Sequence, residues 1–376
     1  MLRTKIKINQ QLFQETSHSP ALHDIVGECD LKQIIDFCFI VNPYYPTDAM
    51  IRKLTDQFPL AIKAYPSSNP RLAQDDLARA LRVDPEHLVI GNGSTELITL
   101  LERELIDDLA VPVPTFSEYL EKLRHPGSAK LFWLPEKEGY RLDLQDFASW
   151  ITGQGISSAL IINPGNPTGQ LIPRDHLLSF LQRMEKLKLI LVDESFIDFS
   201  GIKDQGLMPF VRDYPNLMIV RSMSKHYGVP GLRLGYCCSS NTEYLQRLRE
   251  SLPVWNMNTM AEIFLSLLKE TEKEYWESVR KIVADVEHLY SGLLKIPGYR
   301  VYPTGSNFIL IKITCGLTAR EAQQLLLENF GLYVRDCSNK TGLDAFHIRV
   351  ASQGRKNDEA LINALKELLL LVNNRR

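Results

Sequence analysis

The stretch that decides the fold is Arg221-Ser-Met-Ser-Lys225-His-Tyr-Gly228-Val-Pro-Gly231-Leu-Arg233-Leu-Gly235-Tyr236. A lysine follows a buried apolar strand, with serines at 222 and 224, glycines that let backbone segments approach closely, and an arginine after them. A lysine that is partly desolvated and surrounded by cations favours its neutral amine, which can attack an aldehyde to form a Schiff base. Ser222, Ser224 and Arg233 are suited to hold a phosphate dianion, Arg233 through a forked charge-assisted contact. A surface lysine in a glycine-rich turn is the plainer interpretation, but the combination of signals argues against it.

A second glycine turn lies upstream, in Val89-Ile-Gly91-Asn-Gly93-Ser94-Thr95-Glu96. Strand, turn and helix start follow one another, so Gly93, Ser94 and Thr95 can present backbone N–H groups to an anion at a helix N-terminus. Alone, the pattern is equally typical of a capped helix. Together with the Lys225 stretch it predicts a phosphate cup.

Two polar side chains follow apolar strands elsewhere. In Leu160-Ile-Ile-Asn163-Pro-Gly-Asn166-Pro-Thr-Gly169 a rigid turn aims Asn166 into the site, where its amide can donate to a phenolic oxygen. Asp193 ends the apolar run Leu189–Val192. A lone aspartate at a strand end is usually a helix cap. After so apolar a strand, however, the carboxylate should be partly buried and needs a cationic partner. A protonated pyridine nitrogen is such a partner, and it makes the ring an electron sink.

Composition bounds the remaining possibilities. The chain has 376 residues, 44% apolar and 23% charged, which predicts a soluble globular protein of two domains. A formal charge of −2 makes nucleic acid a poor partner, and no apolar run approaches the roughly 20 residues that span a bilayer. We therefore expect a cytoplasmic enzyme with a small-molecule substrate. The six cysteines lack zinc or redox spacing, which predicts reduced core thiols and no metal.

Apolar runs of strand length alternate with helical patterns, which predicts β-α units around a largely parallel buried sheet. The runs are His87–Ile90, Ser158–Ile162, Lys188–Val192, Leu217–Arg221 and Leu234–Cys238. From about Met260 the pattern changes to helices over Glu262–Val286 and Val286–Leu294, a strand over Asn307–Ile313 and a final helix over Asn357–Val372. We expect a large domain over residues 47–255, a small domain over 256–376, and an N-terminal arm, 1–46, that completes the small domain.

The motifs G-N-G-S-T, P-T-F-S-E-Y, N-P-G-N-P-T-G, D-E-S-F and S-M-S-K…G-L-R-L-G-Y, in this order, resemble the pyridoxal-5′-phosphate (PLP) dependent aminotransferases of classes I and II, which have fold type I. The resemblance implies an α/β fold with a mostly parallel seven-stranded sheet between helices and a smaller α+β domain. It also implies PLP as cofactor, Lys225 as the Schiff-base lysine and a homodimer with shared active sites.

The resemblance further assigns roles by position. Asp193 would contact the pyridine nitrogen, Asn166 the ring hydroxyl, and Phe116 would stack on the ring. Arg349, in Phe346-His-Ile-Arg349, would grip the substrate carboxylate. The phosphate cup would comprise Gly93, Ser94, Thr95, Ser222, Ser224 and Arg233, with Tyr65 reaching it from the partner subunit.

The runs Gly331–Ser338 and Pro253–Asn258 narrow the resemblance to the branch with histidinol-phosphate aminotransferases, threonine-phosphate decarboxylases and 2-aminoethylphosphonate transaminase-like domains. All three handle a phosphorylated or phosphonate amine. Phe196 stands where many aminotransferases have a tyrosine, as in threonine-phosphate decarboxylase-like sequences. The arm lacks the His-Gly-Gly run of those decarboxylases, and Phe37–Pro46 is unusual, which predicts a remodelled substrate pocket. The candidate substrate contacts are Arg335, His23, Tyr119 and Glu118.

Four functions follow from these motifs. An aminotransferase acting through Lys225 leads, since a flexible amine of near-neutral pKa suits proton transfer at Cα. A decarboxylase of a phosphorylated amino acid is the first alternative, and an elimination or cyclisation enzyme acting on a hydroxylated amino acid is the second. A non-catalytic PLP-binding regulator is the remote fourth, because it needs a basic DNA-binding domain for which this chain leaves no room.

Overall fold

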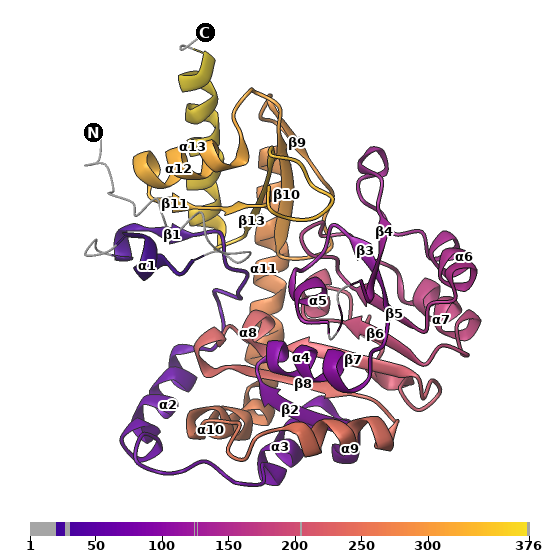
Figure 1. Cartoon of the computed structure of the whole chain (residues 1–376). Helices are drawn as coiled ribbons and strands as arrows, with labels where there is room; N and C mark the ends of the chain where they lie inside the picture. Colours follow the sequence, from indigo (N-terminus) through magenta and orange to yellow (C-terminus); the bar gives the residue numbers. More distant parts are fainter. Residues whose placement is uncertain (1–19, 27–30, 124, 126, 204, 374–376) are drawn as a thin grey trace.

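The computed structural model describes residues 20–26, 31–123, 125, 127–203 and 205–373, which form two packed units (Figure 1). The larger unit contains a seven-stranded sheet in the order β2-β8-β7-β6-β5-β3-β4. Neighbouring strands are parallel except at β8, which runs antiparallel to both β2 and β7. The strands are β2 Leu88–Asn92, β3 Leu109–Val113, β4 Ala129–Trp133, β5 Ser158–Ile162, β6 Leu189–Asp193, β7 Leu217–Ser222 and β8 Leu234–Cys238. The prediction of a mostly parallel seven-stranded sheet is confirmed.

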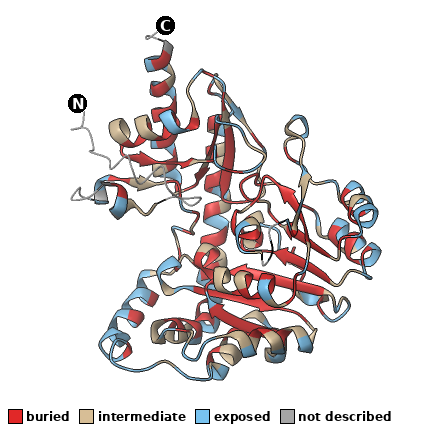
Figure 2. Cartoon of the chain, viewed as in Figure 1, coloured by how far each residue is buried: buried red, intermediate tan, exposed pale blue. Residues whose placement is uncertain are grey.

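Helices cover both faces of this sheet, so its central strands are buried throughout (Figure 2). Side chains alternate between the two faces along each strand. On β6, Leu189 and Leu191 pack in one core with α4 and α9, while Ile190 and Val192 pack in the other with α2, α3, α6, α7 and α10. The helices are α2 Asp48–Ala61, α3 Arg71–Leu81, α4 Ser94–Glu104, α5 Glu118–Glu121, α6 Leu144–Gln154, α7 Arg174–Arg183, α8 Met223–His226, α9 Thr242–Ser251 and α10 Thr259–Leu267.

The smaller unit contains an antiparallel sheet in the order β12-β13-β10-β9, packed against long helices. Its strands are β9 Tyr299–Val301, β10 Phe308–Ile313, β12 Arg335–Asp336 and β13 His347–Ala351, and its helices are α11 Glu272–Leu293, α12 Ala319–Phe330 and α13 Arg355–Asn373. The N-terminal arm adds α1 Leu22–Val26 and β1 Ile35–Asp36, and β1 pairs in parallel with β11 Leu332–Tyr333. This arm therefore packs on the smaller unit before it crosses to the larger one.

The predicted helix break at Val286 is wrong. The chain is helical through that position in α11, and the irregular turn lies earlier, at the 3-10 segment Leu268–Thr271 between α10 and α11. In Figure 1, α11 runs from the larger unit into the smaller one. Tyr275 and Val279 pack in the core of the larger unit, whereas Val286 and Leu289 pack in that of the smaller. We propose that the domain boundary lies within α11 instead of at residue 256.

Polar contacts between the units accompany the shared helix. Lys312 Nζ on β10 donates to both oxygens of Glu136 at 2.8 and 2.9 Å, and Gly305 N donates to Gly169 O at 2.7 Å. Five cysteines are free and buried, whereas Cys29 lies outside the described residues. Among the helices of the described chain, none combines the length and the apolar character needed to cross a membrane.

Candidate active site

A pocket lies beyond the carboxyl ends of β5, β6 and β7, where parallel α/β sheets collect their ligands. It measures about 990 Å³ including the part open to solvent, and both units and the arm contribute to it. Its lining residues are Cys38, Phe39, Ile40, Ser94, Thr95, Phe116, Ile162, Asn166, Asp193, Ser195, Phe196, Ser222, Ser224, Lys225, Arg233, Arg335, Lys340 and Arg349. The structure thus brings together most of the residues that the sequence singled out.

Lys225 occupies the short helix α8 directly after β7. Its backbone carbonyl accepts from Asn42 N at 2.9 Å, so the arm braces the turn that carries the lysine. Burial, with help from the guanidinium groups of Arg349 and Arg233, lowers the pKa of Lys225 to about 8, and Asp193 opposes this shift. Near neutral pH a useful fraction of the amine is therefore unprotonated and nucleophilic.

Among the described residues that line the pocket, Asp193 is the one carboxylate, and it is nearly fully buried. Its Oδ1 accepts from Ser195 N and its Oδ2 accepts from Tyr119 Oη, each at 2.9 Å. Burial raises the pKa of Asp193, which these hydrogen bonds partly offset. No cationic side chain among the described residues lies within ion-pair distance of it. The carboxylate is fixed in place and suited to a cationic partner inside the pocket.

Asn166 and Arg349 form a pair across the two units. Arg349 Nη1 donates to Asn166 Oδ1 at 2.7 Å and Nη2 donates to Cys38 O at 2.7 Å, while Nε is buried without a hydrogen-bond partner among the described residues. The guanidinium also lies over the Phe308 ring, 5.5 Å from its centroid. Because the amide oxygen is occupied, Asn166 is left with its NH₂ as the donor it can offer a ligand. Arg349 is left with a free donor for an anion.

The N-terminus of α4 and the end of β7 converge on one side of the pocket. Ser94 and Thr95 begin α4, and Gly93 precedes it with a left-handed φ of 86°. A Cβ at Gly93 would lie 2.5 Å from Arg233 Nη2, so only glycine lets the arginine reach this helix end. Arg233 Nη1 donates to Ser224 Oγ at 3.4 Å. The Gly93 N–H, predicted to face the anion, instead donates to Gly91 O at 2.8 Å, so the cradle consists of the start of α4, the hydroxyls and the guanidinium.

Two cations from the smaller unit complete the pocket. Arg335, on β12, is buried, and its Nη2 donates to Asn339 Oδ1 at 3.0 Å. Lys340 is also buried, and its Nζ hydrogen-bonds Ser117 Oγ of the larger unit. Lys340 is a site residue that the sequence analysis missed.

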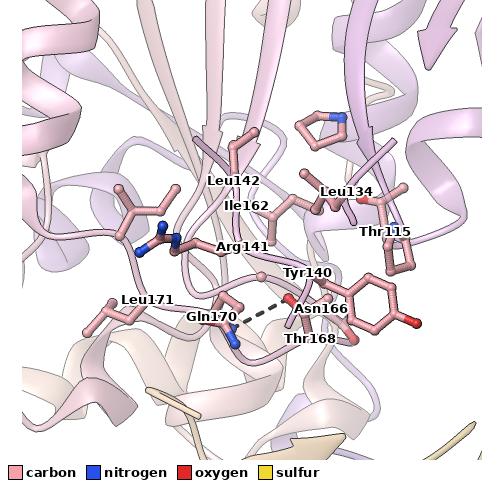
Figure 3. A pocket seen from close by; sticks show the side chains of 14 residues that line it. Thr115, Leu134, Tyr140, Arg141, Leu142, Ile162, Asn166, Thr168, Gln170 and Leu171 are labelled. Carbon is pink, nitrogen blue, oxygen red and sulfur yellow. Dashed lines mark hydrogen bonds between the residues drawn. The ribbon is translucent and has the colours of Figure 1, made fainter. Parts of the chain in front are cut away.

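A second, mostly apolar hollow lies behind the Asn166 turn and shares Asn166 and Ile162 with the main pocket (Figure 3). Tyr140 and Arg141, which follow β4, and Gln170 line it. Asn166 therefore borders both hollows.

A family model for aminotransferases of class I and II matches residues 41–365. This chain belongs to the aminotransferase class I and II family. It is 32% identical to the L-serine phosphate decarboxylase of Sulfurospirillum multivorans over 367 residues, covering 94% of this chain and 93% of that one. The solved structure of a decarboxylase from the same organism superposes with a TM-score of 0.85 at 30% identity, covering 94% of this chain and 93% of that one.

Another relative is the CMP-5′-(3-aminopropyl)phosphonate synthase of Streptomyces rubellomurinus, 32% identical over 338 residues. The match covers 89% of this chain but spans only 53% of that relative's length. Histidinol-phosphate aminotransferases match as well, so the branch inferred from the motifs is confirmed.

As a member of this family the chain is a PLP-dependent enzyme, and its pocket fits the cofactor. The anion cradle suits the PLP phosphate, Asp193 suits the protonated ring nitrogen, and Asn166 has an N–H free for the ring hydroxyl. Bound PLP supplies an aldehyde that condenses with amines and a ring that withdraws electrons from the substrate Cα. Lys225, with its lowered pKa and its place directly after β7, is suited to hold that aldehyde.

The other predicted residues divide into three groups. Phe116 and Phe196 line the pocket, and the Phe196 ring packs edge-on against Phe308 with centroids 5.1 Å apart. Tyr65 lies away from this chain's own pocket, is 82% exposed and faces the Trp255 ring. His23 belongs to α1, but its side chain is outside the described part of the structure, so its role stays a prediction.

The prediction that Tyr119 and Glu118 contact substrate is wrong for this structure. Both are buried and neither lines the pocket. Tyr119 points its hydroxyl at Asp193 and packs edge-on against Phe116, so it positions the groups that meet the cofactor. The apolar run before Pro114-Thr-Phe-Ser-Glu-Tyr119 was the available signal, because a tyrosine after a buried strand usually finds a buried partner.

A buried ion network supports the site from behind. Arg221 Nη2 and Nε donate to Glu194 Oε2 at 2.7 and 3.1 Å, and Nη1 lies 3.5 Å from Asp198 Oδ1. Asp198 Oδ2 also accepts a hydrogen bond from the Oη of Tyr275, which lies on α11, at 2.5 Å. The network ties β7, which leads to Lys225, to the loop that follows Asp193 at the end of β6.

Proposed function

We propose that this enzyme decarboxylates an α-amino acid whose side chain ends in a phosphate or phosphonate, releasing carbon dioxide and the corresponding amine. The observation that carries the proposal is that the pocket holds two arginines from adjacent strands, Arg349 and Arg335, in addition to the anion cradle. A substrate with two anionic ends matches them.

Arg349 suits the α-carboxylate. Its buried Nε has no partner among the described residues, and a guanidinium binds carboxylate through parallel charge-assisted hydrogen bonds. Its other two nitrogens are held by Asn166 and Cys38, so the fork is already oriented. A preoriented group loses little entropy when the substrate binds.

Arg335 suits the second anion. It is 7% exposed and lies on β12 directly opposite Arg349 of β13 in the antiparallel sheet. Both guanidinium groups therefore come from adjacent strands. Two arginines so close favour a ligand with two negative ends over one with a single charge.

Lys225 is the group placed to move the proton. In decarboxylation the carboxylate leaves Cα as carbon dioxide and a proton is delivered to Cα; in transamination a proton is removed from Cα instead. An amine with a pKa of about 8 can do either near neutral pH. Decarboxylation is supported by relatives named as decarboxylases that match over more than 90% of both chains.

Transamination is the second candidate, favoured by the family match and by the histidinol-phosphate aminotransferases among the relatives. A single experiment separates the two. The PLP-loaded enzyme is mixed with O-phospho-L-serine, O-phospho-L-threonine, 2-amino-4-phosphonobutyrate and, as controls, the unphosphorylated amino acids. We expect carbon dioxide and the amine from a phosphorylated substrate, with PLP regenerated. Accumulation of pyridoxamine phosphate and a keto acid would establish transamination in its place.

We also propose a homodimer in which Tyr65 completes the partner's phosphate cradle. Tyr65 is exposed, does not line its own pocket and faces the ring of Trp255, and the larger unit exposes further large apolar side chains. Among them are Phe58, Leu60, Ile62, Leu72 and Val254. Exposed apolar surface is a feature of protein–protein contact sites where it is contiguous.

Mixing two inactive variants tests this arrangement. Lys225→Ala and Tyr65→Ala homodimers should each be weak, whereas subunit exchange should restore about a quarter of wild-type activity, because each heterodimer regains one intact site. Exchange without any recovery, despite heterodimers seen by native mass spectrometry, would place Tyr65 outside the shared site.

A further inference from the structure

Tyr119 is a buried tyrosine whose hydroxyl reaches the carboxylate that suits the cofactor ring. It lies on the short helix α5, and its ring packs in one core with Val111 of β3, Leu191 of β6 and Val220 of β7. Tyr119 Oη donates to Asp193 Oδ2 at 2.9 Å. Tyr119 does not itself line the pocket, so it can affect the cofactor only through the groups that it contacts.

The hydrogen bonds around Asp193 show what Tyr119 contributes. Ser195 N and Tyr119 Oη each donate to a different oxygen of Asp193. Both donors are uncharged, so they favour the ionised carboxylate without neutralising it. Each carboxylate oxygen can accept more than one hydrogen bond, which leaves Asp193 able to accept another from a ligand. Burial raises the pKa of Asp193, whereas the hydrogen bonds from Ser195 and Tyr119 lower it. The protonation state of the carboxyl group therefore depends on a balance in which Tyr119 takes part.

The phenol of Tyr119 is held in its protonated form. Burial and the charge of Asp193 hold the pKa of Tyr119 well above its usual value, with smaller contributions from Cys237 and Glu102. The hydroxyl therefore keeps its proton and acts as a donor to the carboxylate. Tyr119 N also donates to Phe116 O at 3.3 Å, and the two rings pack edge-on with centroids 6.3 Å apart. Tyr119 thus contacts both the residue predicted at the edge of the cofactor ring and the one predicted at its face.

We propose that Tyr119 is a positioning residue that keeps Asp193 ionised and thereby keeps the proton of bound PLP on the ring nitrogen. A protonated ring withdraws electrons from the substrate Cα more strongly than a neutral one. Without the Tyr119 donor the buried carboxylate becomes more basic, and the shared proton moves from nitrogen to oxygen: the N–H bond breaks, an O–H bond forms, and the summed charge of the pair stays zero. The inference rests on the fit of Asp193 to the ring nitrogen, and it applies to decarboxylation and transamination alike.

A role limited to filling the core would require only the ring of Tyr119. Phenylalanine would occupy the same space without burying a hydroxyl, and a buried hydroxyl costs free energy unless it is hydrogen-bonded. Among the described residues, the hydrogen-bond partner of this hydroxyl is Asp193. What the hydroxyl adds is therefore its interaction with the carboxylate, and Tyr119→Phe removes that interaction while keeping the ring.

The position of the proton on the ring nitrogen can be measured directly. The enzyme is loaded with PLP that carries ¹⁵N in the ring, and solid-state ¹⁵N NMR spectra are recorded near neutral pH. Protonated and unprotonated pyridine nitrogens have well-separated chemical shifts, and the shift follows the position of the proton within a hydrogen bond. The wild type should show a protonated nitrogen. Asp193→Asn has no negative charge to offer and should show an unprotonated one, which tests the assignment of Asp193 on its own.

Tyr119→Phe should move the proton equilibrium about 10- to 100-fold toward the carboxyl oxygen, because a hydrogen bond to a charged group is lost. Tyr119→3-fluorotyrosine keeps the ring and donates more strongly, so it should move the ¹⁵N signal in the opposite direction. Tyr244→Phe, on α9, is the matched control. Tyr244 Oη donates to Lys188 O at 2.9 Å, just before β6, whereas Asp193 ends that strand, so this variant should leave the ¹⁵N signal unchanged. Thermal unfolding of each variant shows whether it is folded.

The outcomes separate the two assignments. A folded Tyr119→Phe enzyme with the wild-type ¹⁵N signal overturns the role of Tyr119 and leaves Asp193 at the ring nitrogen. If Tyr119→Phe does not fold, an unchanged signal in the fluorotyrosine variant overturns that role instead. A protonated nitrogen in Asp193→Asn, or an unprotonated one in the wild type, overturns both assignments. No substrate is present in these measurements, so the proposed decarboxylation stands or falls separately.

Discussion

Replacing Arg349 with methionine should remove the affinity of the pocket for a carboxylate while leaving its affinity for a phosphonate nearly intact. Methionine keeps much of the length of the side chain but has no charge and no N–H donor. The substitution removes the hydrogen bonds to Asn166 Oδ1 and Cys38 O, and also the Nε–H donor that we assign to the substrate carboxylate.

The magnitudes follow from these contacts. A hydrogen bond to a charged group contributes about 1.5–3 kcal/mol, so losing the carboxylate contact should weaken binding roughly 10- to 100-fold. Cys38 is buried, with 1% of the residue exposed, and its carbonyl would lose the Arg349 donor. This loss should lower the free energy of unfolding by about 1–3 kcal/mol. Arg349→Lys retains the charge but loses the fork, and we expect an intermediate affinity.

The assay compares 3-phosphonopropionate with propylphosphonate, which lacks the carboxylate, in the PLP-loaded enzyme. The ratio of the two dissociation constants isolates the carboxylate, because loss of stability or of phosphonate binding affects both ligands alike. In the wild type this ratio should be at least ten, and in Arg349→Met close to one. A ratio that the substitution leaves unchanged would refute the assignment of Arg349 to the carboxylate and would point to another cation, Arg335 or Lys340, in that place.

Three further predictions concern the site and its support. Borohydride should fix the cofactor to the Lys225 peptide in the wild type and to no peptide in Lys225→Ala, as peptide mass spectrometry would show; label on another lysine would contradict the assignment. Arg221→Met leaves the buried carboxylates of Glu194 and Asp198 without their cation and should lower the free energy of unfolding by about 3–5 kcal/mol in urea titrations, and a loss below about 1 kcal/mol would argue that the network is not a support. Glu102 is fully buried, and its burial together with the nearby Glu118 raises its pKa to about 8. Between pH 4.5 and 8 the folded state therefore binds more protons than the unfolded chain, so the free energy of unfolding falls as the pH rises. Glu102→Gln should remove that dependence, matching the wild type near pH 4 and exceeding its free energy of unfolding at pH 9 by up to about 5 kcal/mol. Parallel stability curves for the two proteins would contradict this prediction.

The centre of the fold was predictable because its physics is local. Buried parallel strands are apolar on both faces, so β5, β6 and β7 stand out as short apolar runs, and the polar residues that end them mark the ligand edge of the sheet. Asn166, Asp193 and Lys225 were located in this way and lie in one pocket.

Other features depend on contacts that no local pattern reveals. Strand β3 contains Pro112, which normally argues against a sheet interior, and β4 is a half-buried edge strand, so neither stood out. No glycine or proline marks the turn at Leu268–Thr271, because α10 and α11 diverge there to pack on different elements. Lys340 lies in Ser338-Asn-Lys-Thr-Gly342, a sequence typical of a surface turn. Its buried side chain hydrogen-bonds Ser117, which is 223 positions earlier in the chain.

The pair formed by Arg349 and Asn166 connects recognition of the substrate with the cofactor. Asn166 lies on the turn after β5 in the larger unit, and Arg349 lies on β13 in the smaller one. Because Arg349 holds the amide oxygen, the Asn166 NH₂ group would be available to the ring hydroxyl of bound PLP only while the two units keep their present relation. A carboxylate bound at Nε would draw on the same guanidinium, so we propose that substrate binding and the hydrogen bond to the ring are coupled through one side chain. An Asn166→Ala substitution should therefore weaken carboxylate binding as well as shift the cofactor absorbance, and a shift without weaker binding would show that the two ends of the pair act independently.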